Sequence, residues 1–177
     1  MAGKTFDQID WGTEDAKEFA DYWQSLSDKG PVPRKSHFDP TKIVSLLPFI
    51  AIYDVVSPDE IVCRLAGTAL VEHFGQEVTG RNLLDFYQPG IREETGRIMD
   101  EMTTEPCGII VELVGTARSG RTASSLAIGF PLLDDDDQCN RLVFYSSRFE
   151  GSLPYNSRED AIQALNVGRS TTIDISA

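Results

Sequence analysis

The chain has 177 residues, of which 16 are Lys or Arg and 28 are Asp or Glu, so its formal net charge is −12. Hydrophobic residues make up 41% of it, which is typical of a folded globular protein and too high for a disordered chain. The acidic balance argues against a nucleic-acid binder, because contacts to phosphates need clustered Lys and Arg. It also argues against adhesion to anionic membranes.

The length favours a single domain. Three cysteines, Cys63, Cys107 and Cys139, occur without any C-x-x-C motif, which disfavours both a disulfide framework and a structural metal site. The N-terminal residues lack the apolar stretch of a secretory signal, and no apolar run is long enough to span a membrane. We therefore expect a reduced, cytoplasmic protein that binds no metal and does not enter a membrane.

The first predicted element is a helix over residues 14–28, with Thr13 as its N-cap and the G-P-V-P segment at 30–33 as its end. Its apolar residues form one stripe: Ala16, Phe19, Ala20, Tyr22, Trp23 and Leu26. This stripe must be buried, either against the body of its own domain or against the twin helix of a second copy. Phe19, Tyr22, Trp23 and Leu26 are therefore our candidates for contact with a partner or in a homodimer.

The middle of the chain begins with a predicted β-hairpin, formed by residues 49–55 and 61–66 around turn-forming residues. Short helical segments are expected over residues 68–74 and 80–87. A longer helix is expected from Pro89 to about Thr103, because Pro is favoured in the first turn of a helix.

The last part reads mainly as β-structure. Residues 108–117, 122–132 and 141–149 are apolar runs with tight connections, which predicts an antiparallel meander. A short helix is expected over residues 161–167, behind a capping box at 157–160.

Together these elements predict an α+β domain with one five-stranded antiparallel sheet. Alternation along the later strands places apolar side chains on both faces: Phe144 and Leu142 oppose Tyr145 and Val143. A sheet of this kind must be covered on both faces. The short helices can cover one face, and the N-terminal helix or a second copy can cover the other. We expect an N-terminal extension (1–30), the main domain (31–150) and a tail with a short helix (151–177).

The element order resembles that of a PAS domain, and two stretches sharpen the resemblance. R-L-A-G-T-A-L at 64–70 and F-G-Q-E-V-T-G-R-N-L-L-D at 74–85 resemble the second strand, first short helix and G-R-x-L-x-D turn of that family. Tyr22-Trp23, G-P-V-P-R at 30–34 and the later D-P and L-L-P motifs resemble a single-domain PAS-like subgroup of alphaproteobacteria, first catalogued as a domain of unknown function. The resemblance covers about residues 14–149.

The resemblance implies a sensory or regulatory module. PAS domains generally hold a small ligand or cofactor between the sheet and the helices, pass a change to partners through the outer face of the sheet, and often pair through an N-terminal helix. The chain contains no recognisable kinase, cyclase or other output domain. The signal is therefore expected to leave by protein–protein contact, through a homodimer or another partner.

The resemblance also indicates which side chains would line the ligand cavity. The candidates are Tyr53, Arg64, His73, Phe74, Phe86, Tyr87, Phe144 and Tyr145. Aromatic walls with a few polar groups are typical of small-molecule pockets, although the same aromatics can simply pack a core. Arg64 could clamp a ligand carboxylate or phosphate, or it could be a surface residue paired with a carboxylate such as Asp85.

The cofactor remains unknown. Haem-binding PAS domains that use a proximal histidine usually place it on the long helix, and residues 90–103 contain none. Flavin-type photosensors carry an Asn-Cys-Arg motif on the short helices, and residues 80–87 contain no cysteine. Neither haem nor flavin is favoured.

Catalytic residues are not predicted. G-T-A-R-S-G-R-T at 115–122 approaches a phosphate-binding loop, but Arg replaces the required Lys and a strand follows instead of a helix. Two other functions stay open. One is an orphan small-molecule-binding domain. The other is an isomerase-like enzyme of a curved-sheet fold, which would need a buried carboxylate beside a tyrosine, with Glu112 as the only charged residue inside its strand.

Overall fold

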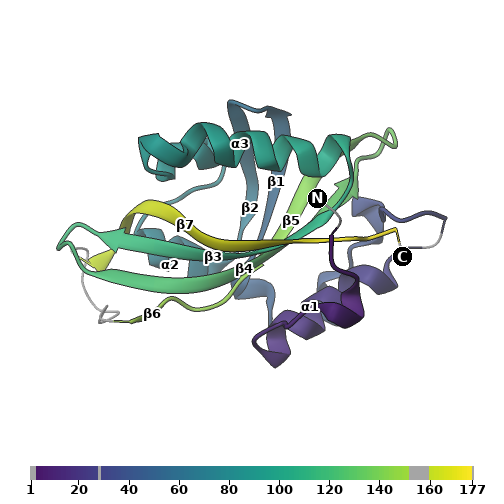
Figure 1. Cartoon of the computed structure of the whole chain (residues 1–177), viewed down its shortest axis with the longest axis horizontal. Coiled ribbons are helices and arrows are strands. Elements are labelled where there is room, and N and C mark those ends of the chain that lie inside the picture. Colours follow the sequence, from purple (N-terminus) through teal and green to yellow (C-terminus); the bar gives the residue numbers. More distant parts are fainter. Residues whose placement is uncertain (1–2, 28, 152–159, 177) are drawn as a thin grey trace.

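The computed structural model describes residues 3–27, 29–151 and 160–176. Its centre is a seven-stranded antiparallel sheet in the order β2-β1-β5-β4-β3-β7, with the short β6 paired to β4 (Figure 1). The strands are β1 (Ile50–Ser57), β2 (Glu60–Ala66), β3 (Gly108–Ala117), β4 (Thr122–Leu133), β5 (Cys139–Ser146), β6 (Glu150–Gly151) and β7 (Ile162–Ile173). The predicted α+β class and antiparallel sheet are confirmed, and β6 and β7 add to the five predicted strands.

Helices cover both faces of this sheet. The α-helices are α1 (Glu14–Ser25), α2 (Thr68–Phe74) and α3 (Pro89–Thr104), and the 3-10 helices are η1 (Phe6–Gln8), η2 (Lys35–His37), η3 (Pro40–Lys42), η4 (Leu47–Phe49) and η5 (Leu83–Phe86). α1 and α3 lie on opposite sides of the sheet (Figure 1). None of the described helices combines the length and apolar composition that crossing a membrane requires.

α1 packs on the sheet of its own chain. Thr13 caps it by accepting a hydrogen bond from the Ala16 amide (3.1 Å), and the helix ends at Ser25, three residues before the predicted end. The Trp23 ring stacks on Phe130 with centroids 4.4 Å apart. Its indole N–H donates to the carbonyl of Pro131 at 3.0 Å. Burial of an aromatic side chain together with its polar atom anchors the helix firmly.

The partner-contact hypothesis needs correction for two of its four residues. Phe19 and Trp23 are 0% and 2% exposed, so their own sheet already covers them and they present no surface to a second copy. Tyr22 and Leu26 are half-buried. The Tyr22 hydroxyl donates to the carbonyl of Asp39 (2.9 Å) and accepts from its amide (2.7 Å), which ties α1 to the loop before η3. Of the two covers predicted for the stripe, the structure contains the one within the chain.

Alternation along the strands creates two separate cores, as predicted. Val143 and Tyr145 lie in the core under α1. Leu142 and Phe144 face the opposite side, where α2, η5 and α3 pack. We call the side under α1 the outer face and the opposite side the inner face.

The G-R-N-L-L-D segment closes the β2 edge of the sheet. The Gly80 amide donates to the Cys63 carbonyl (2.6 Å), and the Cys63 amide donates to the Arg81 carbonyl (3.0 Å). Gly80 has φ +80°, a conformation that favours glycine. The Asn82 side chain accepts from the amides of Ile61 and Leu84, both at 3.1 Å, and so joins the sheet edge to the start of η5.

The prediction of a helix over residues 161–167 is wrong. This segment is the first half of β7, which pairs with β3 along almost its whole length. β3 would otherwise have an unpaired edge, and pairing its backbone outweighs the weak local preference for helix. Residues 162–173 are therefore part of the sheet and not of a tail, with Leu165 and Ile173 buried. Residues 157–159 of the expected capping box lie outside the described residues.

Candidate functional site

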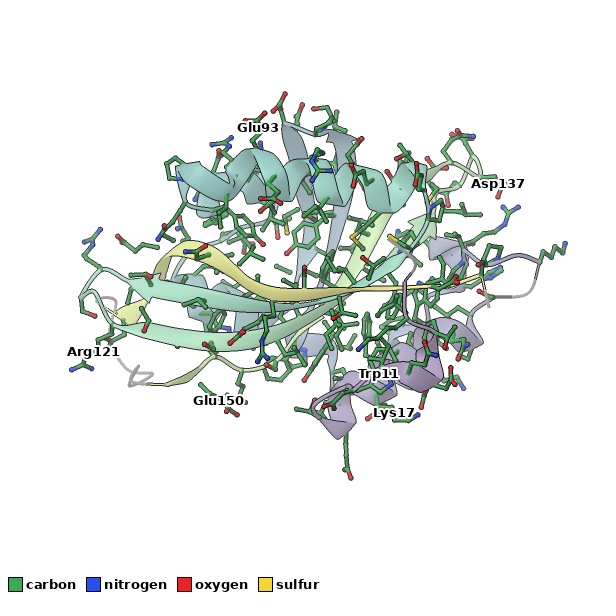
Figure 2. All side chains as sticks on the ribbon, in the orientation of Figure 1. Trp11, Lys17, Glu93, Arg121, Asp137 and Glu150 are labelled. Carbon is green, nitrogen blue, oxygen red and sulfur yellow. The ribbon has the colours of Figure 1, made fainter. Side chains whose placement is uncertain are left out.

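A cavity of about 60 Å³ lies between the inner face of the sheet and the helices α2, η5 and α3. Side chains of the sheet and of α3 project into the space between them (Figure 2). Aromatic rings form the walls: Phe74 and Phe86 lie 4.8 Å apart between centroids, and Tyr53 and Phe144 lie 5.9 Å apart. Aliphatic side chains complete the lining, among them Leu70, Leu83, Met99, Val111, Leu113 and Leu165.

Four polar side chains interrupt this apolar lining: Tyr53, Tyr87, Ser146 and Cys63. Burial raises the pKa of the Tyr53 and Tyr87 hydroxyls well above the ordinary value. Burial also raises the pKa of the Cys63 thiol to about 11. These groups are therefore protonated and uncharged at neutral pH. Among the described residues, no Asp, Glu, Lys, Arg or His lines the cavity.

The hydroxyl groups are available for hydrogen bonding. Within the described part of the chain, Tyr53, Tyr87 and Ser146 make no side-chain hydrogen bond, whereas the Cys63 thiol donates to the Leu65 carbonyl at 3.5 Å. These three hydroxyl groups can therefore donate to, or accept from, a molecule that enters the cavity.

A second space of about 220 Å³ lies beside the cavity, between α3 and the strands β3 and β7. The two spaces share five lining residues: Tyr87, Met99, Val111, Leu113 and Phe144. We call this space the α3 groove. Displacement of Tyr87 or Phe144, which contact both spaces, would join the groove to the cavity.

Five of the eight predicted cavity residues line the cavity: Tyr53, Phe74, Phe86, Tyr87 and Phe144. His73 lies just behind the lining, buried, with its ring edge-on to Phe149 at 5.2 Å. Burial lowers the pKa of this imidazole to about 4.

Arg64 and Tyr145 do not reach the cavity, which corrects their predicted role there. Tyr145 packs on the outer face against Phe19 of α1, with ring centroids 5.9 Å apart. The Arg64 guanidinium pairs with Asp54 at 2.7 Å and not with Asp85, which pairs with Arg92 instead. Sequence reasoning missed Cys63, Met99 and Ser146. Ser146 could have been found, because it follows Phe144 by two residues on the same strand.

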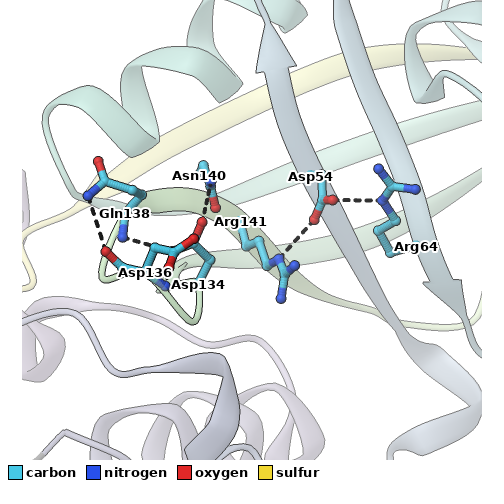
Figure 3. A network of polar contacts seen from close by, with 7 residues as sticks. All are labelled: Asp54, Arg64, Asp134, Asp136, Gln138, Asn140 and Arg141. Atoms are coloured by element: carbon cyan, nitrogen blue, oxygen red, sulfur yellow. Dashed lines mark hydrogen bonds and ion pairs between the residues drawn. The ribbon is translucent and has the colours of Figure 1, made fainter.

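Carboxylates at the β4–β5 turn organise the turn itself. Asp134 accepts hydrogen bonds from the amides of Asp136 and Gln138, both at 2.9 Å, and from the Asn140 side chain at 2.7 Å (Figure 3). The hydrogen bond from the Gln138 amide is the main cause that lowers the pKa of Asp134. Asp137, at φ 60°, pairs with Arg34 at 2.6 Å. In the ranges that the structure describes, no three His, Cys, Asp or Glu side chains gather as a metal site would require.

Comparison with known proteins places these features in a family. The PAS domain family matches residues 13–144, from the cap of α1 to the cavity residue Phe144 in β5. No curated protein matches the chain.

Among solved structures, the chain is similar to the LOV domain of the blue-light photoreceptor Aureochrome1 in its light state, with 18% identity, 60% of this chain and 84% of that one covered, and TM-score 0.46. It is similar to the LOV domain of a blue-light activated histidine kinase from Erythrobacter litoralis, with 21% identity, 60% and 99% covered, and TM-score 0.45. VqmA of Vibrio cholerae gives 16% identity, with 64% of this chain and 52% of VqmA covered, and TM-score 0.48. The family match spans most of the chain and includes α1, the first hairpin, the short helices and most of β5, and the chain belongs to the PAS domain family.

Proposed function

We propose that this chain is a PAS-type sensory module whose inner cavity takes a small uncharged ligand and whose response leaves by protein contact on the outer face. The main support for this proposal is the cavity lining: in the described part of the chain, three hydroxyl groups without hydrogen-bond partners surround a space that no charged side chain lines. Such a lining favours a ligand with an apolar body and one or two hydrogen-bonding groups. A charged ligand would lose its hydration and gain no counter-ion.

The volumes limit the size of this ligand. An apolar cavity that binds benzene measures about 150 Å³, and the cavity here has about 60 Å³. A ligand with more than a few heavy atoms would therefore displace Tyr87 or Phe144 and extend into the α3 groove of about 220 Å³. The two spaces together approach the lower end of small-molecule sites, at roughly 300 Å³. Neither the ring system of a flavin nor that of a haem fits the residues as they stand.

The outer face is the proposed output surface. α1 covers only part of it, and an open groove of about 520 Å³ continues beyond the start of α1, lined mainly by polar side chains such as Glu112, Ser147, Arg148 and Arg169. A second copy of the chain is our first candidate for the contact there. A different partner would present a basic face, because the chain carries a net charge of −12. We place this module in the cytoplasm.

Two alternatives are less well supported. An orphan ligand-binding domain would use the same cavity but would need no output contact. An isomerase would need a carboxylate beside Tyr53 or Tyr87. Glu112 is half-exposed on the outer face, where Arg169 lies 4.0 Å away, so it offers no carboxylate to the cavity.

The ligand class can be tested with three probes of similar size: phenol, benzene and benzoate, titrated into the ¹⁵N-labelled chain and followed by NMR. We expect phenol to bind more tightly than benzene, and benzoate not to bind. Tyr87→Phe removes only a hydroxyl, so it should weaken the binding of phenol and leave the binding of benzene unchanged. Tyr22→Phe removes a hydroxyl outside the cavity and is the matched control. Benzoate binding as tightly as phenol would contradict the uncharged class, and no binding of any probe would contradict the ligand site.

A further inference from the structure

A cluster of charged side chains lies on the outer face, where the strands β2, β1 and β5 run side by side. Asp54 of β1 occupies its centre and accepts two hydrogen bonds, from Arg64 Nε of β2 at 2.7 Å and from Arg141 Nε of β5 at 3.0 Å (Figure 3). The two guanidinium groups reach Asp54 from opposite sides, and each binds a different carboxylate oxygen.

These residues line an open depression of about 380 Å³, which we call the notch. Its lining consists of Lys35, Ile52, Asp54, Arg64 and Arg141. Ile52 is buried, whereas Arg64 is exposed and Arg141 half-buried. The lining itself therefore holds three cationic groups and one carboxylate, an excess of two positive charges, and the Asp134 carboxylate outside the lining interacts with Arg141. This excess stands out in a chain whose net charge is −12.

The arginines use only part of their hydrogen-bonding capacity. Each donates to Asp54 through Nε, and in the described residues the Nη atoms of Arg64 and Arg141 have no hydrogen-bond partner. The Arg64 side chain is exposed, and exposed ion pairs contribute little to stability, so stability alone does not account for Arg64 and Lys35 beside the Arg141–Asp54 pair. Asp54 instead holds both guanidinium groups in place with their N–H donors available. Such donors match the oxygens of phosphate and carboxylate groups.

The charge selects between these two groups. A phosphate monoester carries about −1.5 to −2 at pH 7, which balances the excess of two positive charges, whereas a carboxylate would leave one positive charge unpaired. We propose that the notch binds a phosphate group, carried by a small phosphorylated ligand or by a phosphorylated side chain. Leu65 is exposed and pairs with Ile52 of the notch, so it offers an apolar contact to the molecule that carries the phosphate.

The phosphate site is separate from the ligand cavity. The notch and the cavity lie on opposite faces of the sheet and share no lining residue. The two proposals can therefore fail independently of each other.

The test is a titration of the full ¹⁵N-labelled chain with inorganic phosphate at constant ionic strength, observed at the arginine Nε–H signals and nearby amides. We expect saturable shifts at Arg64, Arg141 and Lys35. Arg64→Gln and Lys35→Gln should each weaken the binding of phosphate about tenfold. Arg141→Lys keeps the charge but loses the planar donor pair, so it should weaken phosphate binding as well. Thermal melting establishes that each variant is folded.

Arg97→Gln is the matched control, because the Arg97 and Arg64 side chains are both 56% exposed and Arg97 pairs with a single carboxylate, that of Glu101. Phosphate affinity should be unchanged in this variant. The carrier of the phosphate is identified by comparing free phosphoserine with a phosphoserine peptide. Equal affinity indicates a small ligand, and tighter binding of the peptide indicates a protein. Either result supports the site. No saturable shift in the notch, or equal weakening in Arg97→Gln, would overturn the proposal.

Discussion

Phe144 and Tyr145 are neighbours on β5, and their side chains lie on opposite faces of the sheet. The Phe144 ring lines the cavity 5.9 Å from Tyr53, and the Tyr145 ring packs 5.9 Å from Phe19 of α1. Protein interiors are close-packed and transmit displacements from one element to the next. Under the proposed function, we expect a ligand that displaces Phe144 also to shift β5 and the face of the sheet on which α1 packs.

Gly129 leaves room for the Phe144 ring. The two residues are paired across β4 and β5, and a Cβ at Gly129 would lie 2.2 Å from the ring of Phe144. Gly129→Ala should lower the free energy of unfolding by about 1–3 kcal/mol, because the ring must move toward the cavity. Urea denaturation measures this loss. Phe144→Leu should remove most of it in a double-mutant cycle, since the smaller side chain avoids the clash. Strict additivity of the two substitutions would show that Phe144 is not what limits position 129.

Trp23 should be a determinant of folding. Trp23→Ala removes a buried ring and its hydrogen bond to Pro131, so we expect a loss of about 3–5 kcal/mol in the free energy of unfolding. Leu26→Ala, at the half-buried C-cap of the same helix, should cost less. Light scattering accompanies the denaturation. A Trp23→Ala chain that keeps its stability but changes from dimer to monomer would contradict the burial of this ring within the chain.

Asn82 should contribute more to the free energy of unfolding than residues in exposed turns usually do. Its side chain accepts from the Ile61 and Leu84 amides and donates to the Asp59 carbonyl at 2.8 Å. Asn82→Ala leaves these backbone groups without partners and should cost about 1–3 kcal/mol in urea denaturation. Asn82→Asp keeps the acceptor and loses the donor, so it should cost less than Asn82→Ala. Equal losses for the two variants would indicate that the bond to Asp59 dominates.

His73 should make stability depend on pH. The imidazole pKa is about 4 in the folded chain, where burial lowers it, against an ordinary value of 6.5. Between these values the unfolded chain binds more protons, so the free energy of unfolding rises with pH from about 4 to 6.5 and falls as pH drops. The contribution is about 1–3 kcal/mol. His73→Leu should flatten this part of the profile in urea denaturation, and an unchanged slope would assign it to other groups.

Local patterns in the sequence predicted much of the fold. The capped stripe of α1, the first hairpin and the alternation on β5 are short-range signals, and the structure confirms the elements they indicate. β7 was missed because its strand conformation depends on the open edge of β3, far away in the chain. The cover of the α1 stripe also depends on tertiary packing, so the sequence alone left two alternatives for it.

The candidate site was predicted only in part, because strand pairing as well as local sequence decides which face of the sheet a side chain takes. Tyr53, Phe74, Phe86, Tyr87 and Phe144 are brought together by the fold, as expected. Arg64 points to the outer face because it follows Cys63, which pairs with Tyr53 and lines the cavity on the inner face. A shift of one residue changes the face to which a side chain points, and no local motif signals it.

Hydrogen exchange of α1 during cavity occupancy tests most directly whether the inner cavity communicates with the outer face. The amides of α1 are followed in the wild-type chain with and without saturating phenol, and with benzoate as the control. The coupling of Phe144 to Tyr145 predicts that phenol changes the exchange rates of α1 amides around Phe19 while benzoate does not. Saturation of the cavity signals by phenol, with exchange in α1 unchanged, would contradict it.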